Sequence, residues 1–131
     1  MRRGLVLLIA LVMALSACGG GGEDGSDDTG ATESTLAAGN SDNGVAIYAG
    51  TCMVCHGQAG EGVEGLGKPW VGSEFINART DAEMLAFLIE GRPSDHPENT
   101  TGIAMMPRGG NPNLTDADLM DLIAYMRTLN P

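Results

Sequence analysis

The feature that most constrains this chain is a pair of cysteines separated by two residues and followed directly by a histidine: Cys52, Cys55 and His56. Such a trio can be a redox-active disulfide, one half of a zinc site, or the attachment point of a covalently bound haem. Each possibility requires different partners elsewhere in the chain, so the other residues can decide among them.

The rest of the chain favours the haem. A structural zinc site would need a second pair of ligands. The third cysteine, Cys18, lies in the N-terminal signal-like segment, so His96 is the only further candidate. A thioredoxin-like centre needs a strand before the motif, and no strand pattern precedes it. A plain disulfide is the alternative in an oxidising compartment. We expect one haem c, bound covalently through Cys52 and Cys55, with His56 as an iron ligand.

The first 17 residues have the pattern of an export signal. Two arginines precede an apolar run from Leu5 to Leu15, which is too short for a comfortable membrane span. The next residues, Leu15-Ser16-Ala17-Cys18, resemble the lipobox of bacterial lipoproteins, whose cysteine is lipidated and becomes the mature N-terminus. The resemblance implies a protein anchored by a lipid on Cys18 to the periplasmic or cell-surface side of a bacterial membrane.

Residues 18–43 are predicted to be a disordered tether. Behind Cys18 this segment is rich in glycine and contains six acidic residues and no basic one. It cannot bury enough apolar surface to offset the entropy lost on ordering. A flexible chain of this length reaches roughly 25–30 Å, which suits a leash between a membrane and a folded domain.

The remaining 88 residues, 44–131, are expected to form one small domain with a marginal core, which a covalent cofactor would help to stabilise. This part carries 5 basic and 11 acidic residues. The negative charge argues against nucleic acid as a partner and fits a redox protein with a basic docking surface.

Three segments of the domain have helical periodicity, and strand patterns are scarce. In the first, Val45, Tyr48 and Cys52 are expected on one face. The other two open with capping boxes, in which a threonine is followed three residues later by an acid. The loops between the helices, 56–79 and 91–114, are long enough to surround a large bound group. The helices are expected from about Asp42 to Cys52, from Thr80 to Gly91, and from Thr115 to the C-terminus.

The domain resembles the class I bacterial cytochromes c over essentially all of residues 44–131. Gly44, Tyr48 and Cys52 repeat the spacing of that family's first helix, and the segment 121–125, DLIAY, is similar to its last helix. The resemblance implies a small all-α fold of about three main helices wrapped around one haem. It also implies that the first and last helices cross, with Gly44 and Tyr48 packing against Leu122 and Tyr125.

The resemblance implies further site residues in the two long loops. Pro69 matches a proline whose carbonyl accepts a hydrogen bond from the haem histidine, and Trp70 either packs on the haem or is an ordinary core residue. The segment 101–112, TGIAMMPRGGNP, resembles the loop that supplies a methionine as the sixth iron ligand. Its register favours Met105, whereas the Met-Pro pairing would favour Met106. His96 is the nitrogen alternative.

The favoured function is one-electron transfer between redox proteins, without enzymatic activity, because an iron ligated by His56 and Met105 has no vacant position. Two alternatives stay open at this point. One is a haem sensor or small catalyst with a labile sixth ligand, and the other is a fixed electron-transfer subunit of a larger oxidoreductase.

Overall fold

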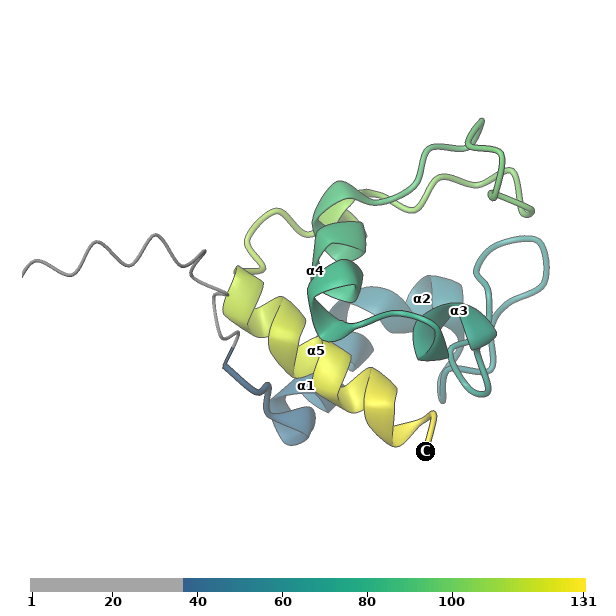
Figure 1. Ribbon diagram of the computed structural model, residues 1–131. Coiled ribbons are helices and arrows are strands. Elements are labelled where there is room, and N and C mark those ends of the chain that lie inside the picture. Colours follow the sequence, from purple (N-terminus) through teal and green to yellow (C-terminus); the bar gives the residue numbers. More distant parts are fainter. Residues whose placement is uncertain (1–36) are drawn as a thin grey trace, which may run out of the picture. The chain divides into compact units, whose positions relative to one another are not determined.

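The computed structural model describes residues 37–131, so the expected signal segment and Cys18 lie outside the described residues. Within residues 37–131 the chain is helical, with two isolated bridges and no β-strand, which confirms the predicted all-α class. None of the helices described here is long and apolar enough to cross a membrane. The elements are α1 (Ser41–Ile47), η1 (Tyr48–Cys52), α2 (Met53–His56), α3 (Glu74–Asn77), α4 (Asp81–Glu90), η2 (Pro107–Gly110) and α5 (Asp116–Thr128) (Figure 1).

The first three elements follow one another without a break over residues 41–56. Asn40 caps the start, since its side-chain oxygen accepts hydrogen bonds from the backbone N–H groups two and three residues on. In the middle, η1 is a single π-helical turn, a feature often found beside functional sites. The segment ends at Gly57, whose φ of 86° favours glycine. The predicted helix therefore extends past Cys52 and carries the whole Cys-x-x-Cys-His motif.

The first helix crosses α5, as the sequence predicted (Figure 1). Gly44 makes the close approach possible, because a Cβ there would overlap the Asp121 carbonyl oxygen and lie 2.8 Å from the Tyr125 Cβ. Tyr48 packs edge-on against Tyr125, with ring centroids 5.4 Å apart. The Asp121 carboxylate also accepts a hydrogen bond of 2.6 Å from the backbone N–H of Asn40.

Both predicted capping boxes are confirmed. The Thr80 hydroxyl accepts a hydrogen bond from the backbone N–H of Glu83, whose carboxylate accepts the Thr80 backbone N–H at 2.8 Å. Thr115 and Asp118 repeat the arrangement at the start of α5, with a backbone-to-carboxylate distance of 2.8 Å. Each box satisfies two backbone donors that the first turn of a helix leaves unpaired.

Arg127, near the end of α5, ties this helix to the segment that joins α3 and α4. Its guanidinium donates to the carbonyl oxygens of Ile76 and Arg79, both at 2.7 Å, and to the Asp81 carboxylate at 2.9 Å. Three directed bonds from one planar group fix the angle between the two parts.

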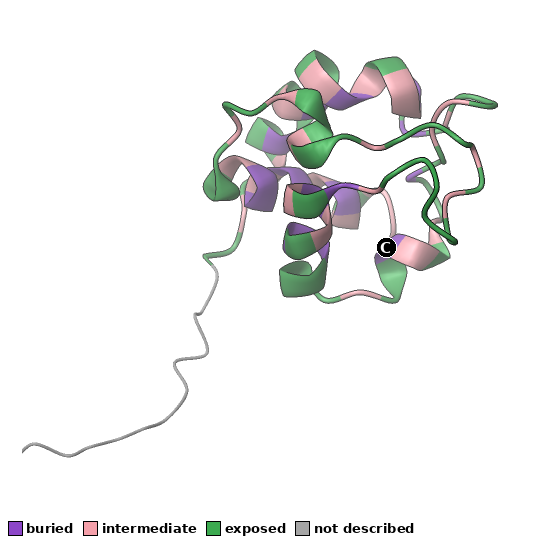
Figure 2. Ribbon diagram, turned by 90° about the horizontal axis from the view of Figure 1, so that it is seen from above, coloured by how far each residue is buried: buried purple, intermediate pink, exposed green. Residues whose placement is uncertain are grey.

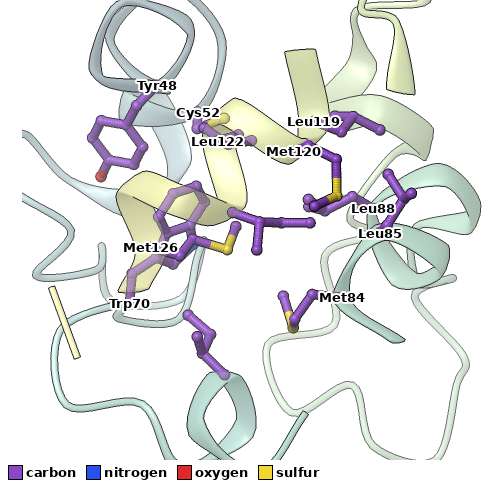
Figure 3. Close-up of a cluster of buried hydrophobic side chains, with 12 residues drawn as sticks. Tyr48, Cys52, Trp70, Met84, Leu85, Leu88, Leu119, Met120, Leu122 and Met126 are labelled. Carbon is purple, nitrogen blue, oxygen red and sulfur yellow. The ribbon is translucent and has the colours of Figure 1, made fainter. Parts of the chain in front are cut away.

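The core forms where the inner faces of η1, α4 and α5 meet (Figures 2 and 3). Val45 was predicted to face it and is instead 46% exposed. The buried stripe of the first helix runs through Gly44, Tyr48 and Cys52, spaced four residues apart, and Val45 lies one position off that line. The buried hydrophobic residues are Tyr48, Cys52, Trp70, Ile76, Met84, Leu85, Leu88, Leu119, Met120, Leu122, Ile123 and Met126.

Two short elements lie in segments that the sequence predicted to be loops. The helix α3 begins behind Ser73, whose hydroxyl accepts a hydrogen bond from the backbone N–H of Ile76 at 3.4 Å. The 3₁₀ turn η2 contains Arg108 at a φ of 54°, held by donation to the Leu114 carbonyl oxygen and the Asp116 carboxylate. Both are too short to give a periodic signal.

Candidate functional site

A cavity of about 800 Å³ opens beside the Cys-x-x-Cys-His motif. Cys52, Cys55 and His56 line it, and so do Met105 and Met106 from the loop between α4 and η2. Typical ligand pockets have volumes of about 300–1,000 Å³, so this cavity can hold a large group. The structure thus brings together residues that lie about 50 positions apart in the sequence.

His56 ends α2 and is fixed by a hydrogen bond from its ring. Its Nδ1 lies 2.7 Å from the carbonyl oxygen of Lys68, which can only accept, so Nδ1 carries the proton and Nε2 keeps a free lone pair. Burial lowers the pKa of His56, and the bond to Lys68 opposes part of that change. The imidazole is therefore neutral near pH 7, as metal ligation requires.

The acceptor of this bond is one position away from the expected one. Pro69 was expected to supply the carbonyl, but the structure gives this role to Lys68, and Pro69 lines the cavity beside it. A residue before proline is kept in extended conformations. In an extended segment successive carbonyls point in opposite directions, so only one of the two can face the ring.

Gly67 lets the loop approach the motif closely enough for this bond. A Cβ at this position would overlap the carbonyl oxygen of Cys55 and lie 3.3 Å from Nδ1 of His56. The backbone of the loop therefore packs directly on the backbone of α2, which only glycine permits.

Two aromatic residues hold the turn behind His56. The Tyr48 hydroxyl donates to the Gly57 carbonyl oxygen at 2.5 Å, and burial raises the pKa of Tyr48 to about 12, so the donor stays protonated. The backbone N–H of Trp70 donates to the Gly60 carbonyl oxygen at 2.7 Å. The Trp70 ring is buried, lines the cavity, and lies 4.7 Å from Tyr48 and 5.2 Å from His56 between centroids. It is thus both a core residue and part of the cavity wall.

The two thiols differ in burial. Cys52 is buried and Cys55 is half-buried, and burial, with a smaller contribution from Cys55, raises the pKa of Cys52 to about 12. Redox-active cysteines in Cys-x-x-Cys motifs need a depressed pKa, because the thiolate is the nucleophile. The environment of Cys52 therefore disfavours a disulfide redox centre.

The loop of residues 92–105 leaves the end of α4 and returns to it, with its two arms side by side (Figure 1). Arg92 and Met105 exchange backbone hydrogen bonds of 2.7 and 2.9 Å. A Cβ on Gly91 would overlap the Met105 carbonyl oxygen, so glycine is required there as well. Met105 is half-buried and packs against the core, whereas Met106 is 57% exposed.

His96, the nitrogen alternative, lies in the same loop but is exposed and does not line the cavity. Its Nδ1 accepts a hydrogen bond of 3.2 Å from the backbone N–H of Glu98. The structure does not bring this ring to the site.

A cationic and aromatic part of the cavity wall was not predicted from the sequence. The rings of Phe75 and Phe87 meet edge-on at 4.9 Å, and the guanidinium carbon of Arg79 lies 3.4 Å from the Phe75 centroid. That of Arg92 lies 4.8 and 5.0 Å from the two rings. Two arginines directly behind α3 and α4, in a domain with few bases, were the available signal. They favour a ligand with anionic substituents.

The lining residues fit a haem. Two free thiols are available for thioether bonds, a neutral imidazole and a thioether for the iron, and two guanidinium groups for the carboxylates. Buried apolar side chains form much of the remaining wall, as in most cofactor sites.

Comparison with known proteins agrees with this geometry. The sequence model of the cytochrome c family, described as "Cytochrome c", matches residues 41–130, which include every described residue discussed above except Asn40. No significant match was found among curated proteins or among solved structures. A match over more than half of the chain is decisive, and the chain belongs to the cytochrome c family.

Proposed function

We propose that this protein carries single electrons with an iron bound by His56 and Met105, and that a lipid on Cys18 holds it at a membrane. As a member of the cytochrome c family it is a haem-binding electron-transfer protein, and its cofactor is a covalently attached haem c. The observation that carries the proposal is that His56 and the Met105-Met106 pair line one cavity.

When bound, the haem supplies an iron that gains and loses one electron. Cys52 and Cys55 hold the group covalently. The bond from His56 to Lys68 fixes the orientation of the imidazole and raises its basicity. The Met105 thioether is a soft ligand that favours ferrous iron. If His56 and Met105 both bound the iron, no position would be left for a small molecule, which favours electron transfer over catalysis.

Met105 is favoured over Met106 by its backbone and its burial. Both the N–H and the carbonyl of Met105 are bonded to Arg92, so the start of its side chain is fixed relative to α4. Its side chain packs against the core, whereas the side chain of Met106 is largely in solvent. A ligand must be held in one position, and the bonded backbone and half-buried side chain of Met105 support this role.

The packing around the cavity suits electron transfer. Met84, Leu88 and Met126 line the cavity and are 1–2% exposed. Close-packed apolar side chains exclude water and resist rearrangement when the charge on the iron changes. The packed side chains thus keep the arrangement of the residues around the iron nearly the same in both oxidation states.

The proposed lipid anchor and the proposed class of redox partner rest on features of the sequence. The lipobox-like segment at Cys18 and the glycine-rich acidic tether support a domain that stays at a membrane surface and can move between donor and acceptor. The acidic surface supports redox partners with basic docking surfaces, because opposite charges steer association.

A pair of methionine variants tests the ligand assignment. Met105→Ala should lose the weak red absorption band of a methionine-ligated ferric haem and should bind carbon monoxide in the ferrous state. Met106→Ala, the matched control, should keep the band and exclude carbon monoxide. If Met106→Ala loses the band instead, the assignment is off by one residue, and if neither variant loses it, the methionine assignment fails and His96→Ala is the next variant to measure.

The same preparations test the alternatives. Carbon monoxide binding to the reduced wild type would indicate a sensor or catalyst, and a stable co-purifying complex would indicate a fixed subunit. Cys18→Ser should release the domain from membranes with an unchanged spectrum. A wild type that is already free of lipid and membrane would end the anchor proposal.

A further inference from the structure

One side chain of the 92–105 loop, that of Asn99, uses all of its hydrogen-bonding capacity within the loop. Its Nδ2 donates to the carbonyl oxygens of Pro93 at 2.9 Å and Ile103 at 2.8 Å. Its Oδ1 accepts from the backbone N–H groups of Thr101 at 3.1 Å and Gly102 at 2.9 Å, and from the Thr101 hydroxyl at 3.2 Å. Both donors and the acceptor oxygen are thus in use, and exchanging oxygen and nitrogen would break all four bonds to the backbone.

These bonds connect the two arms of the loop. Pro93 lies on the arm that leaves α4, and residues 101–103 lie on the arm that returns and continues directly to Met105. The backbone bonds between Arg92 and Met105 join the two arms at the base of the loop. The side chain of Asn99 joins them further along, through its bonds to Pro93 and Ile103.

The loop has little apolar burial of its own. Residues 93–98 are all exposed, and so are Ile103 and Ala104 directly before Met105. Within the chain itself, its shape therefore comes mainly from hydrogen bonds, and the side chain of Asn99 makes four to the backbone and accepts a fifth from the Thr101 hydroxyl. Arg92 adds a bond of 2.9 Å to the Glu98 carboxylate on the surface, where such pairs contribute little.

We infer that Asn99 is a positioning residue for the sixth iron ligand: by joining the two arms it holds the backbone of Met105 where its thioether remains on the iron. The inference rests on the proposed ligand role of Met105. An external ligand can bind the iron only in the fraction of molecules in which the thioether has left it, so its apparent affinity reports that fraction.

The test is a titration of the ferric, haem-loaded protein with imidazole, followed by loss of the red band. Asn99→Ala removes the four bonds to the backbone and the bond from the Thr101 hydroxyl, and each net hydrogen bond changes an equilibrium several-fold. Imidazole should therefore bind at least about tenfold more tightly than to the wild type. Asn99→Asp keeps the acceptor but loses both donors, and should give an intermediate increase.

Ser94→Ala is the matched control, because Ser94 is exposed in the same loop and its side chain makes no hydrogen bond among residues 37–131. It should bind imidazole as the wild type does. The reduction potential gives a second readout, and should fall in Asn99→Ala because the ferric form loses methionine more readily. A merely structural role would lower the unfolding temperature and leave both readouts unchanged.

The outcomes separate this inference from the proposed function. If Met105→Ala loses the red band and Asn99→Ala binds imidazole like the wild type, Asn99 has no positioning role, while the ligand assignment stands. If Met105→Ala keeps the band, the ligand assignment is wrong and the role of Asn99 falls with it. Should Asn99→Ala fail to fold, Asn99→Asp decides, and wild-type affinity in that variant overturns the inference.

Discussion

Gly67→Ala is the substitution for which the structure gives the sharpest expectation. The new Cβ would overlap the carbonyl oxygen of Cys55 and lie 2.7 Å from its carbonyl carbon, whereas ordinary contact begins at 3.4 Å. Both neighbours are backbone, so neither can rotate away. The overlap with the oxygen is closer than the contact with the carbon, so either the loop or α2 must retreat by more than about 0.7 Å.

A retreat of this size acts directly on the histidine, because Lys68 is the next residue. The bond of 2.7 Å between the Lys68 carbonyl and His56 Nδ1 would lengthen to more than about 3.4 Å, beyond the usual range for an N–H···O bond. Overpacking costs about 1–3 kcal/mol and the lost hydrogen bond about 0.5–1.5 kcal/mol, giving a destabilisation of roughly 2–4 kcal/mol. A less basic imidazole also stabilises ferric iron less well, so the reduction potential should rise.

Urea unfolding and a spectroscopic redox titration of the haem-loaded protein measure the two effects. Gly65→Ala is the control in the same loop, since nothing lies within 4 Å of its added Cβ. Its φ of 71° should still cost about 1–2 kcal/mol, with no change in potential. If Gly67→Ala unfolds like Gly65→Ala and keeps the wild-type potential, the close approach does not control the histidine bond and the reasoning is wrong.

Two further predictions concern the helices. Gly44→Ala should destabilise the protein by about 1–3 kcal/mol in urea unfolding, because its Cβ would overlap α5. Gly50→Ala, with nothing within 4 Å, should be neutral or slightly stabilising, and equal losses in both would contradict the crossing argument. Hydrogen bonds from Thr80 and Thr115 lower the pKa values of Glu83 and Asp118. Their contribution to stability is therefore present above the pKa values of the unfolded chain and is lost as the pH falls through the lower folded values. In a plot of unfolding temperature against pH, Glu83→Gln and Asp118→Asn should reduce the fall of the unfolding temperature at acidic pH. An unchanged slope would show that the capping boxes do not act through the charge of these side chains.

Sequence reasoning succeeded where a single residue has one local physical role. The two threonines that open α4 and α5 predicted the helix starts because capping is decided within four residues. The resemblance to the cytochromes c implied the helix crossing, and Gly44 makes it possible because only a residue without a side chain allows two backbones to approach so closely. The Cys-x-x-Cys-His motif likewise has a fixed chemical meaning in a chain with no second ligand pair.

Sequence reasoning failed where the outcome depends on which of two adjacent residues faces another part of the structure. The carbonyl beside His56 comes from Lys68 and not from Pro69, a difference of one residue in an extended segment. Val45 and Gly44 differ by one position on a helix. The Val45 side chain was predicted to face the core, but Gly44 is the residue that does so. Arg79 and Arg92 reach the cavity only because α3 and α4 bring them there, and their position behind two helices in a domain with few bases was a weak signal of that role.

The two proposed iron ligands are held by different kinds of structure, and this difference bears on how the protein works. His56 ends a continuous helical segment and lies beside the buried rings of Tyr48 and Trp70. Met105 ends an exposed loop whose shape depends on the hydrogen bonds of Asn99. Solvent-exposed hydrogen bonds open at a lower free energy than a packed core does. We therefore expect the Met105 side to open first, while the proposed bonds from Cys52, Cys55 and His56 would keep the haem in place until Met105 binds again.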